Sequence, residues 1–244
     1  MLSNERVCVI EHAPVWSNGI KKTFIEEGIA TPDTLDIIRV HKGEQLPEIA
    51  NYSLLALSGG EMGVYELDKP EYRHIKDEYK YVERAILLGV PVVGFCLGHQ
   101  FLGSFFGSRV IRNEAKREIG YYEVTMTEKC KKIPSMCGLP DKMSVFLYHN
   151  DHVESQPSNS LLLATTENSP LQILYYPNER VMSFQFHPEM CKDNGNFLFR
   201  RDKKYLASVG LDYRNLVASC GCLDDQGRRH LLRKAVVTLG FGQN

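Results

Sequence analysis

Short apolar runs alternate with helix-like patterns through the first half of the chain. Apolar residues at helical spacing end near Gly28 and recur over 72–86, and a third helix is expected from Gly98 to Gly107. The apolar runs between them suit strands buried on both faces: Val7–Ile10, Leu35–Val40, Leu54–Leu57 and Val90–Phe95. This alternation predicts βαβ units, and hence an α/β fold whose open, mostly parallel twisted sheet has helices on both faces.

The second half of the chain is richer in strand patterns. A turn-like segment, Pro177–Arg180, separates the last two patterns and predicts a hairpin. The expected strands are Ile119–Met126, Met143–Tyr148, Leu161–Thr165, Gln172–Tyr176 and Val181–Phe186, and helices are expected over 196–217 and 228–239. No internal repeat or low-complexity linker interrupts the chain. We therefore expect one domain over 1–200 and a C-terminal helical extension, 201–244, packed on it.

Composition excludes several classes of protein. A hydrophobic share of 43% and a charged share of 24% are typical of globular chains and exclude a disordered or fibrous one. The net charge of -1 argues against non-specific nucleic-acid binding as the main activity. No stretch approaches the roughly 20 apolar residues that span a bilayer. Nucleic acid and membrane are therefore not expected partners.

Seven cysteines in a chain whose N-terminus lacks a signal-peptide pattern predict reduced thiols and a cytoplasmic location. Cys220 and Cys222 stand close enough to form half of a metal site, but no second pair matches them, so no metal is expected. The segment 201–244 carries an excess of Lys and Arg over Asp and Glu. This excess fits either a docking surface for an acidic partner or, as we favour, an ordinary solvated helix face.

The segment around Cys96 is the most informative in the chain. A buried strand ends in Gly94-Phe95-Cys96-Leu97-Gly98, and a helix begins at once. This is the nucleophile-elbow pattern, with Cys where many hydrolases carry Ser. Glycine is needed on both sides because a side chain there would collide with neighbouring backbone. The elbow presents Cys96 at the carboxyl end of the sheet, where the start of a helix is expected to lower the pKa of the thiol. A lone Cys is usually a small buried hydrophobe, but the flanking glycines favour a nucleophile.

A thiol nucleophile needs a base and a group that orients the base. Among eight histidines, His187 fits best because it follows an apolar strand, and Glu189 stands two residues on. His149 is the rival, with Asp151 as its possible partner. Ser58-Gly59-Gly60, at the end of the third strand, suits an oxyanion loop, because glycine lets the backbone approach a ligand closely. Read alone, this segment could also be a simple turn; no P-loop motif supports a phosphate site.

Together these three segments resemble the class I glutamine amidotransferases, most closely the glutaminase portion of GMP synthase and its free-standing relatives. Tyr148–Asp151 and Glu118–Tyr121 resemble further segments of that family, and the resemblance covers roughly 5–200. It implies a flavodoxin-like amidotransferase fold for the first domain. It also implies that Cys96 attacks the side-chain amide of glutamine, that His187 hands a proton to departing ammonia and that Glu189 orients His187.

The resemblance further implies an oxyanion hole made by the N–H groups of Gly60 and Leu97. Gln100 matches the family glutamine that contacts substrate. The backbone around Tyr148, His149 and Asn150 matches the loop that holds the α-amino and carboxylate groups of the substrate. No cofactor is implied.

Two positions depart from the family pattern. Glu61 stands where proline commonly follows the oxyanion glycines, and Asn150 stands where glycine is frequent. Neither change removes a catalytic group, but both alter the walls of the substrate pocket. The segment Glu61–Asp68 lies beside the predicted site and could set the choice of substrate.

Three functions remain open at this stage. The first is a glutaminase that supplies ammonia to a separate synthetase subunit, because GMP synthase fuses this domain to an ammonia-accepting one that has no counterpart here. The second is a stand-alone hydrolase that uses the same triad on a γ-glutamyl peptide or conjugate. The third is a non-catalytic regulator that keeps the fold, which the complete triad disfavours.

Overall fold

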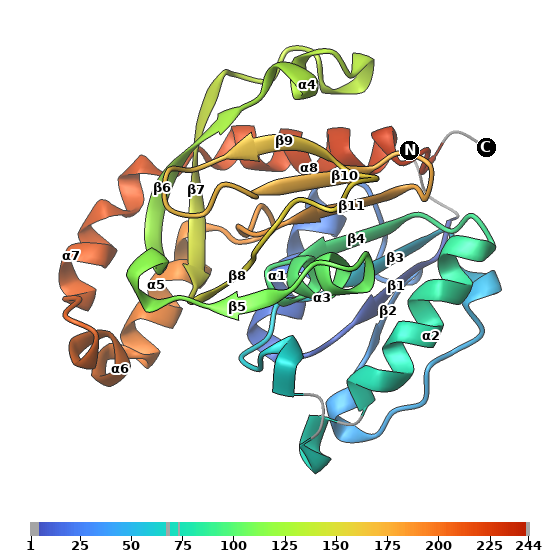
Figure 1. Ribbon diagram of the computed structural model, residues 1–244, viewed down its shortest axis with the longest axis horizontal. Coiled ribbons are helices and arrows are strands. Elements are labelled where there is room, and N and C mark those ends of the chain that lie inside the picture. Colours follow the sequence, from blue (N-terminus) through green and yellow to red (C-terminus); the bar gives the residue numbers. More distant parts are fainter. Residues whose placement is uncertain (1–4, 67–68, 73, 243–244) are drawn as a thin grey trace.

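The computed structural model describes residues 5–66, 69–72 and 74–242 (Figure 1). Its main sheet has nine strands in the order β2-β1-β3-β4-β11-β10-β9-β6-β7, and β5 pairs with β8 in a second, two-stranded sheet. The strands are β1 (Val7–Ile10), β2 (Leu35–Ile38), β3 (Leu54–Leu57), β4 (Val92–Phe95), β5 (Val110–Arg112), β6 (Glu118–Met126), β7 (Lys142–His149), β8 (Asp151–Val153), β9 (Leu161–Thr165), β10 (Ile173–Tyr176) and β11 (Val181–Phe184).

The main sheet joins a parallel half to an antiparallel half. The neighbours among β2, β1, β3, β4 and β11 pair in parallel. From β11 onward, β11–β10, β10–β9, β9–β6 and β6–β7 all pair antiparallel. The expected α/β fold is confirmed. So is the hairpin: β10 and β11 pair antiparallel across the predicted turn, in which Arg180 adopts a φ of 55°.

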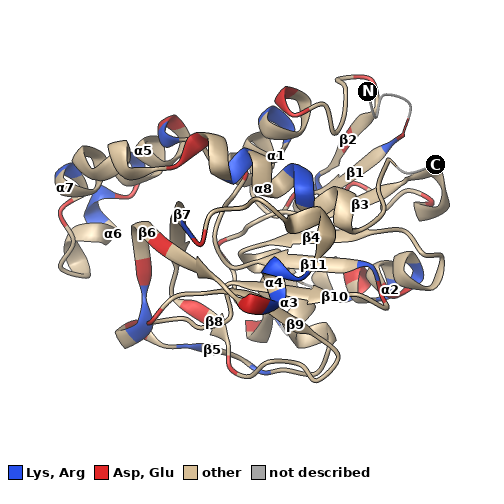
Figure 2. Ribbon diagram, turned by 90° about the horizontal axis from the view of Figure 1, so that it is seen from above, with Lys and Arg blue, Asp and Glu red and all other residues tan. Residues whose placement is uncertain are grey.

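Helices cover both faces of the sheet (Figures 1 and 2). They are α1 (Pro14–Glu26), α2 (His74–Leu87), α3 (Leu97–Phe105), α4 (Glu128–Lys131), α5 (Lys192–Arg201), α6 (Lys203–Ser208), α7 (Tyr213–Ala218) and α8 (Asp225–Thr238). Apolar residues of α1 and α8 pack into one core with β1, β3 and β4, and those of α2 and α3 pack into a second core on the opposite face. Strand residues alternate between the two cores, as a period of two requires: Val7 and Val9 face α1, and Cys8 and Ile10 face α2.

The parallel pairing determines where the site lies. β1, β3, β4 and β11 all end at the same edge of the sheet, where they continue into Glu11, Ser58, Cys96 and Gln185. Ligands of open α/β sheets bind outside this carboxyl edge. The sequence segments with candidate chemistry therefore meet there.

The C-terminal part differs from the sequence prediction in its helices. The range 196–217 is helical as expected, but it is divided: α5 ends at Arg201, α6 ends before Gly210 and α7 begins only at Tyr213. Gly210 has a φ of 79°, a left-handed conformation that ends a helix. These helices and β6–β7 share a third apolar cluster, and both positively and negatively charged residues occur along the helices (Figure 2). Within the described residues, no helix is both long and apolar enough to cross a membrane.

Candidate active site

Cys96 sits on a strained turn between β4 and α3. Its backbone has a φ of 51° and a ψ of -98°, a conformation that non-glycine residues rarely adopt and that often marks functional sites. A Cβ on Gly94 would lie 2.6 Å from the carbonyl oxygen of Gly98, and one on Gly98 would lie 2.5 Å from that of Leu57. Both glycines are therefore required by close backbone contacts, as the sequence predicts.

His187 and Glu189 form a buried pair after β11. Nδ1 of His187 donates to Oε1 of Glu189 at 2.7 Å, and both side chains are fully buried. Trp16 of α1 stacks on the imidazole with ring centroids 4.2 Å apart and an angle of 13° between the planes. The backbone N–H of His187 donates to the carbonyl of Phe146. The ring is thus held on one face and at one nitrogen. Within the described part of the chain, its other nitrogen, Nε2, has no hydrogen-bond partner.

Arg228 of α8 contacts the segment that carries His187 and Glu189. It is 1% exposed, and its guanidinium donates to the carbonyl of Pro188 at 2.9 Å and to the carboxylate of Asp225. Thr23 of α1 donates to the carbonyl of Glu189 at 2.8 Å. A helix far along the sequence therefore helps to fix the His187–Glu189 pair. No local pattern indicated this role for Arg228, whose neighbours include several other charged residues.

Cys96 and His187 come from adjacent strand ends, but no hydrogen bond between their side chains is found within the described residues. Sγ of Cys96 lies 3.9 Å from the carbonyl oxygen of Tyr148 and 3.9 Å from Nε2 of Gln185. The thiol thus contacts the carbonyl of Tyr148 and the amide of Gln185 in this arrangement. Contacts between catalytic groups are frequently loose before substrate binds.

The environment of Cys96 corrects one sequence prediction. The expected lowering of its thiol pKa is wrong: burial raises the pKa well above the ordinary value, and the charges of Glu189 and Asp151 raise it further. The N–H of Leu97 at the start of α3 acts in the expected, lowering direction, but it is outweighed. The resting thiol is therefore protonated, and a base must remove its proton during reaction.

The expected oxyanion donors, Gly60 and Leu97, are brought together. A Cβ on Gly60 would lie 2.5 Å from Cδ2 of Leu97, so the side chain of Leu97 packs directly against the backbone of Gly60. Leu97 opens α3, where the first N–H groups lack helical acceptors, and its N–H faces the sulfur of Cys96. Among the residues that the structure describes, the N–H of Gly60 has no acceptor.

A buried pair that the sequence did not reveal fixes the oxyanion loop. The backbone N–H of His12 donates to Oγ of Ser58 at 2.9 Å, and Nδ1 of His12 bonds to the carbonyl oxygen of Ser58 at 2.8 Å. Nε2 of His12 lies 2.8 Å from Glu78, and both side chains are fully buried. Burial lowers the pKa of His12, but the charge and hydrogen bond of Glu78 outweigh that effect and raise the pKa above the ordinary value.

Glu78→Gln is expected to destabilise the protein in a pH-dependent way. Because the pKa of His12 is raised on folding, its contribution to stability is present below the unfolded value of roughly 6.5 and is lost as pH rises through the folded value. Unfolding in denaturant should show a loss of about 3 kcal/mol near pH 6 that shrinks toward pH 9. Glu83→Gln, on the exposed side of the same helix, is the control and should change little. An equal loss at both pH values would show that His12 is uncharged.

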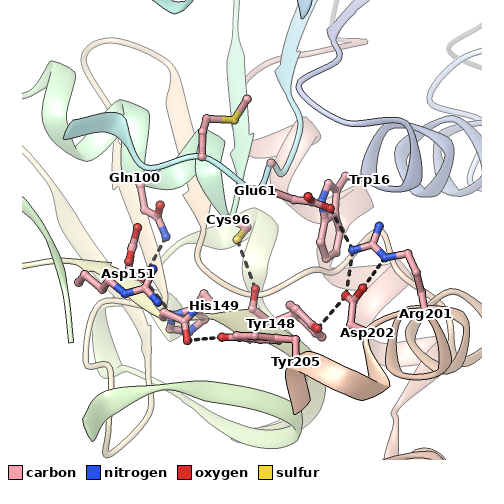
Figure 3. A pocket seen from close by; sticks show the side chains of 14 residues that line it. Trp16, Glu61, Cys96, Gln100, Tyr148, His149, Asp151, Arg201, Asp202 and Tyr205 are labelled. Carbon is pink, nitrogen blue, oxygen red and sulfur yellow. Dashed lines mark hydrogen bonds and ion pairs between the residues drawn. The ribbon is translucent and has the colours of Figure 1, made fainter. Parts of the chain in front are cut away.

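A pocket with a volume of about 390 Å³ opens beside Cys96 (Figure 3). All the expected substrate-binding residues line it: Gln100, Tyr148, His149 and Asn150. So do Asp151 and Met62, which belong to segments that the sequence analysis placed at the site, and five residues that it did not indicate: Trp16, Arg112, Arg201, Asp202 and Tyr205. His187 and Glu189 lie beneath the surface. The last three newly found residues belong to α5, α6 and their junction, so the C-terminal segment helps to build the pocket.

The pocket side chains are held by bonds to one another. Nε2 of Gln100 donates to the carbonyl of Asp151 at 2.9 Å. His149 is bonded through both ring nitrogens, to the carbonyl of Asp151 at 3.0 Å and to the buried carboxylate of Glu118 at 3.0 Å. His149 therefore has no free nitrogen to act as a base, and its carboxylate partner is Glu118 rather than Asp151. This arrangement favours His187.

The two departures from the family pattern both contact the C-terminal helices. The carboxylate of Glu61 accepts from Arg201 at 2.9 Å, across the mouth of the pocket (Figure 3). Oδ1 of Asn150 accepts from Arg117 at 2.6 Å and from the hydroxyl of Tyr205 at 3.0 Å. The side chains of Glu61 and Asn150 thus each have hydrogen-bond partners that proline or glycine at these positions could not bind. Of the segment Glu61–Asp68, Leu67 and Asp68 lie outside the described residues.

Comparison with known proteins decides the family. A family model described as glutamine amidotransferase class-I matches residues 17–202, a range that contains Cys96, His187 and Glu189. The chain belongs to the class I glutamine amidotransferase family. It is an enzyme of that type, and the expected resemblance is confirmed.

Relatives and solved structures agree with this assignment. The chain is 36% identical over 141 residues to a GMP synthase of Thermosipho melanesiensis, a match that covers 57% of this chain and 25% of the relative. It is 33% identical to a glutamine-hydrolyzing GMP synthase subunit of Pyrococcus abyssi, with coverage of 51% and 65%. It is 30% identical to the glutamine amidotransferase-like protein YfeJ of Salmonella typhimurium, with coverage of 72% and 73%.

Among solved structures, a glutamine amidotransferase of Thermotoga maritima superposes with a TM-score of 0.82 at 27% identity, covering 96% of this chain and 97% of that one. The match spans the C-terminal helices as well as the sheet. By contrast, this chain spans only about a quarter of the GMP synthase of T. melanesiensis. The family and these relatives support hydrolysis of glutamine as the chemistry of the site.

Within the described residues, no group of three or more His, Cys, Asp or Glu side chains could hold a metal ion. Cys220 is partly buried and Cys222 is exposed, and both are free thiols.

Proposed function

We propose that the protein hydrolyses the side-chain amide of glutamine through a γ-glutamyl thioester on Cys96. His187 carries this proposal. Its ring is fixed by Glu189 and Trp16, whereas its buried Nε2 is unpartnered in the described structure and lies at the strand end next to Cys96. A buried nitrogen without a partner is costly unless a ligand or a reacting group engages it.

Substrate must first bring Cys96 and His187 into contact. When the amide of glutamine enters, the thiol turns from the carbonyl of Tyr148 toward Nε2 of His187. The thiol gives its proton to Nε2, and the sulfur attacks the amide carbon. Because burial keeps the resting thiol protonated, this transfer belongs to the reaction rather than to the free enzyme.

The oxyanion that forms is bound by the N–H of Gly60, which has no acceptor among the described residues, and by the N–H of Leu97, which faces the sulfur of Cys96. The C–N bond then breaks, the proton passes from Nε2 of His187 to the leaving nitrogen, and ammonia departs. Water, deprotonated by the same Nε2, attacks the thioester, and glutamate is released with the thiol restored. Glu189 holds one ring orientation throughout.

Gln100, Asn150 and the backbone from Tyr148 to His149 bind the α-amino and carboxylate groups in this proposal. All of them line the pocket, and Gln100 and His149 lie on the side of Cys96 away from Trp16 (Figure 3). The chemistry uses amino-acid side chains and water alone, so the proposed mechanism includes no cofactor.

We also propose that ammonia passes to an acceptor on a separate synthetase subunit. The relative from P. abyssi is named as one subunit of a GMP synthase, which supports a divided enzyme.

Residues 201–244 would fold with 1–200 rather than apart from them, since α8 joins the sheet core and Arg228 bonds to the carbonyl of Pro188.

The test is turnover of L-glutamine by the purified protein. We expect glutamate and ammonia in equal amounts, with no turnover of D-glutamine or L-asparagine, because the pocket is chiral and its reach from Cys96 is fixed. A glutamine-analogue chloroketone should also modify Cys96 rather than the exposed Cys137 or Cys222. The absence of both ammonia release and Cys96 modification would contradict the proposal.

A further inference from the structure

The pocket has two sides, separated by Cys96 (Figure 3). Gln100, His149 and Asp151 lie on one side, and Trp16, Glu61 and Arg201 lie on the other. Trp16 stacks on His187, the residue that protonates the leaving nitrogen in the proposed mechanism. A general acid must lie against the leaving group. The Trp16 side is therefore the leaving-group side.

The leaving-group side continues into a second space. Glu61 and Arg201 line both the catalytic pocket and an open groove of about 580 Å³ between α1 and α5. The remaining groove walls are uncharged: Ala13, Pro14, Val15, Asn18, Asn194 and Phe197. Phe197 is a large apolar side chain that is 56% exposed here. Ammonia, the leaving group of glutamine, needs no groove with an apolar wall, whereas an alkyl chain on the amide nitrogen would fill one.

The charge at the entrance to this groove is negative. The guanidinium of Arg201 bonds to Asp202 at 2.6 and 2.9 Å and to Glu61 at 2.9 Å. Two carboxylates thus surround one cation. The hydroxyl of Tyr148 already donates to Asp202, whereas the side chain of Glu61 is 66% exposed and can accept a further donor. A positively charged leaving group is favoured at this position over a neutral or negative one.

We propose that the site accepts γ-glutamyl amides whose leaving amine is an alkyl chain ending in an ammonium group, and that Glu61 selects the positive charge. This rests on the proposed function and gives its substrate class. The thiol of Cys96 attacks the γ-carbonyl, the C–N bond breaks, and the thiol proton passes through His187 to the nitrogen of the departing amine. Water then releases glutamate from the thioester, so one amide and one water give glutamate and one diamine.

Three amides of similar length test the role of charge: γ-glutamyl diaminobutane, γ-glutamyl butylamine and γ-glutamyl aminobutanoate, whose far ends are cationic, neutral and anionic. Glutamine is the reference. For the wild type we expect kcat/KM to fall in that order, by at least about tenfold from the first amide to the last. Glu61→Gln should bring the three within about threefold of one another. Glu123→Gln is the matched control, because Glu123 on β6 is also an exposed carboxylate paired with a cation, Lys142. In this variant the order of the three amides should persist.

Protection of Cys96 against the glutamine-analogue chloroketone gives the same order without requiring turnover. Hydrolysis of glutamine with no discrimination among the amides, or discrimination that Glu61→Gln leaves intact, overturns this inference and leaves the proposed function standing. If none of the four compounds is hydrolysed or protects Cys96, and the chloroketone does not modify it, both proposals fail together.

Discussion

Cys96→Ala is expected to lower glutamine turnover by at least about 10⁴-fold, because no other nucleophile can form the thioester. The backbone at position 96 should tolerate alanine, since the strained turn is fixed by Gly94, Gly98 and the bond from the N–H of Cys96 to the carbonyl of Phe184 at 2.7 Å. The variant should therefore fold. Ammonia release at saturating glutamine and far-ultraviolet circular dichroism measure the two effects separately.

Cys222→Ala is the matched control for this prediction. Cys222 is exposed, and its side chain lies outside the pocket lining. Its variant should match the wild type in both measurements. If Cys96→Ala kept more than about one-tenth of the turnover, the nucleophile would have to be another group, and the account of the elbow would be wrong.

Gly98→Ala is expected to destabilise the protein by about 3 kcal/mol and to lower turnover by at least about a hundredfold. The added Cβ would lie 2.5 Å from the carbonyl oxygen of Leu57 and 2.8 Å from its Cβ, so β3 and α3 must move apart. β3 leads directly into Ser58-Gly59-Gly60, and α3 follows Cys96. The same displacement would therefore separate the oxyanion loop from the nucleophile.

Gly221→Ala supplies the comparison, because a Cβ there meets nothing within 4 Å. Denaturant unfolding should show a change within about 0.5 kcal/mol for Gly221→Ala. A small loss of stability in Gly98→Ala together with full activity would show that β3 and α3 are not held at the spacing described here.

Local patterns sufficed to predict the elements that position the site. The elbow at Cys96 was recognisable because a buried strand, two glycines and a helix lie within one short segment, and the structure requires both glycines sterically. His187 and Glu189 were recognisable because they are close in sequence as well as in space. The parallel half of the sheet was predictable because apolar runs alternate with helical patterns in the first half of the chain.

Contacts between distant segments were not predictable in this way. Trp16 stacks on a ring 171 positions away in the sequence, and the charge of Arg228 gave no hint that it would be buried against Pro188. Helical spacing over 196–217 does not show where one helix ends and the next begins, because the stop at Gly210 depends on its left-handed backbone. The direction of the thiol pKa of Cys96 depended on burial and on two carboxylates from other segments, which no local pattern encodes.

The thioester on Cys96 is tested by the mass of the protein quenched with acid during turnover of saturating glutamine. We expect a fraction of the wild-type protein to carry one γ-glutamyl group, which peptide mapping places on Cys96, and we expect Cys96→Ala to carry none. A γ-glutamyl group on any other residue, or one that persists in Cys96→Ala, would contradict a thioester on Cys96.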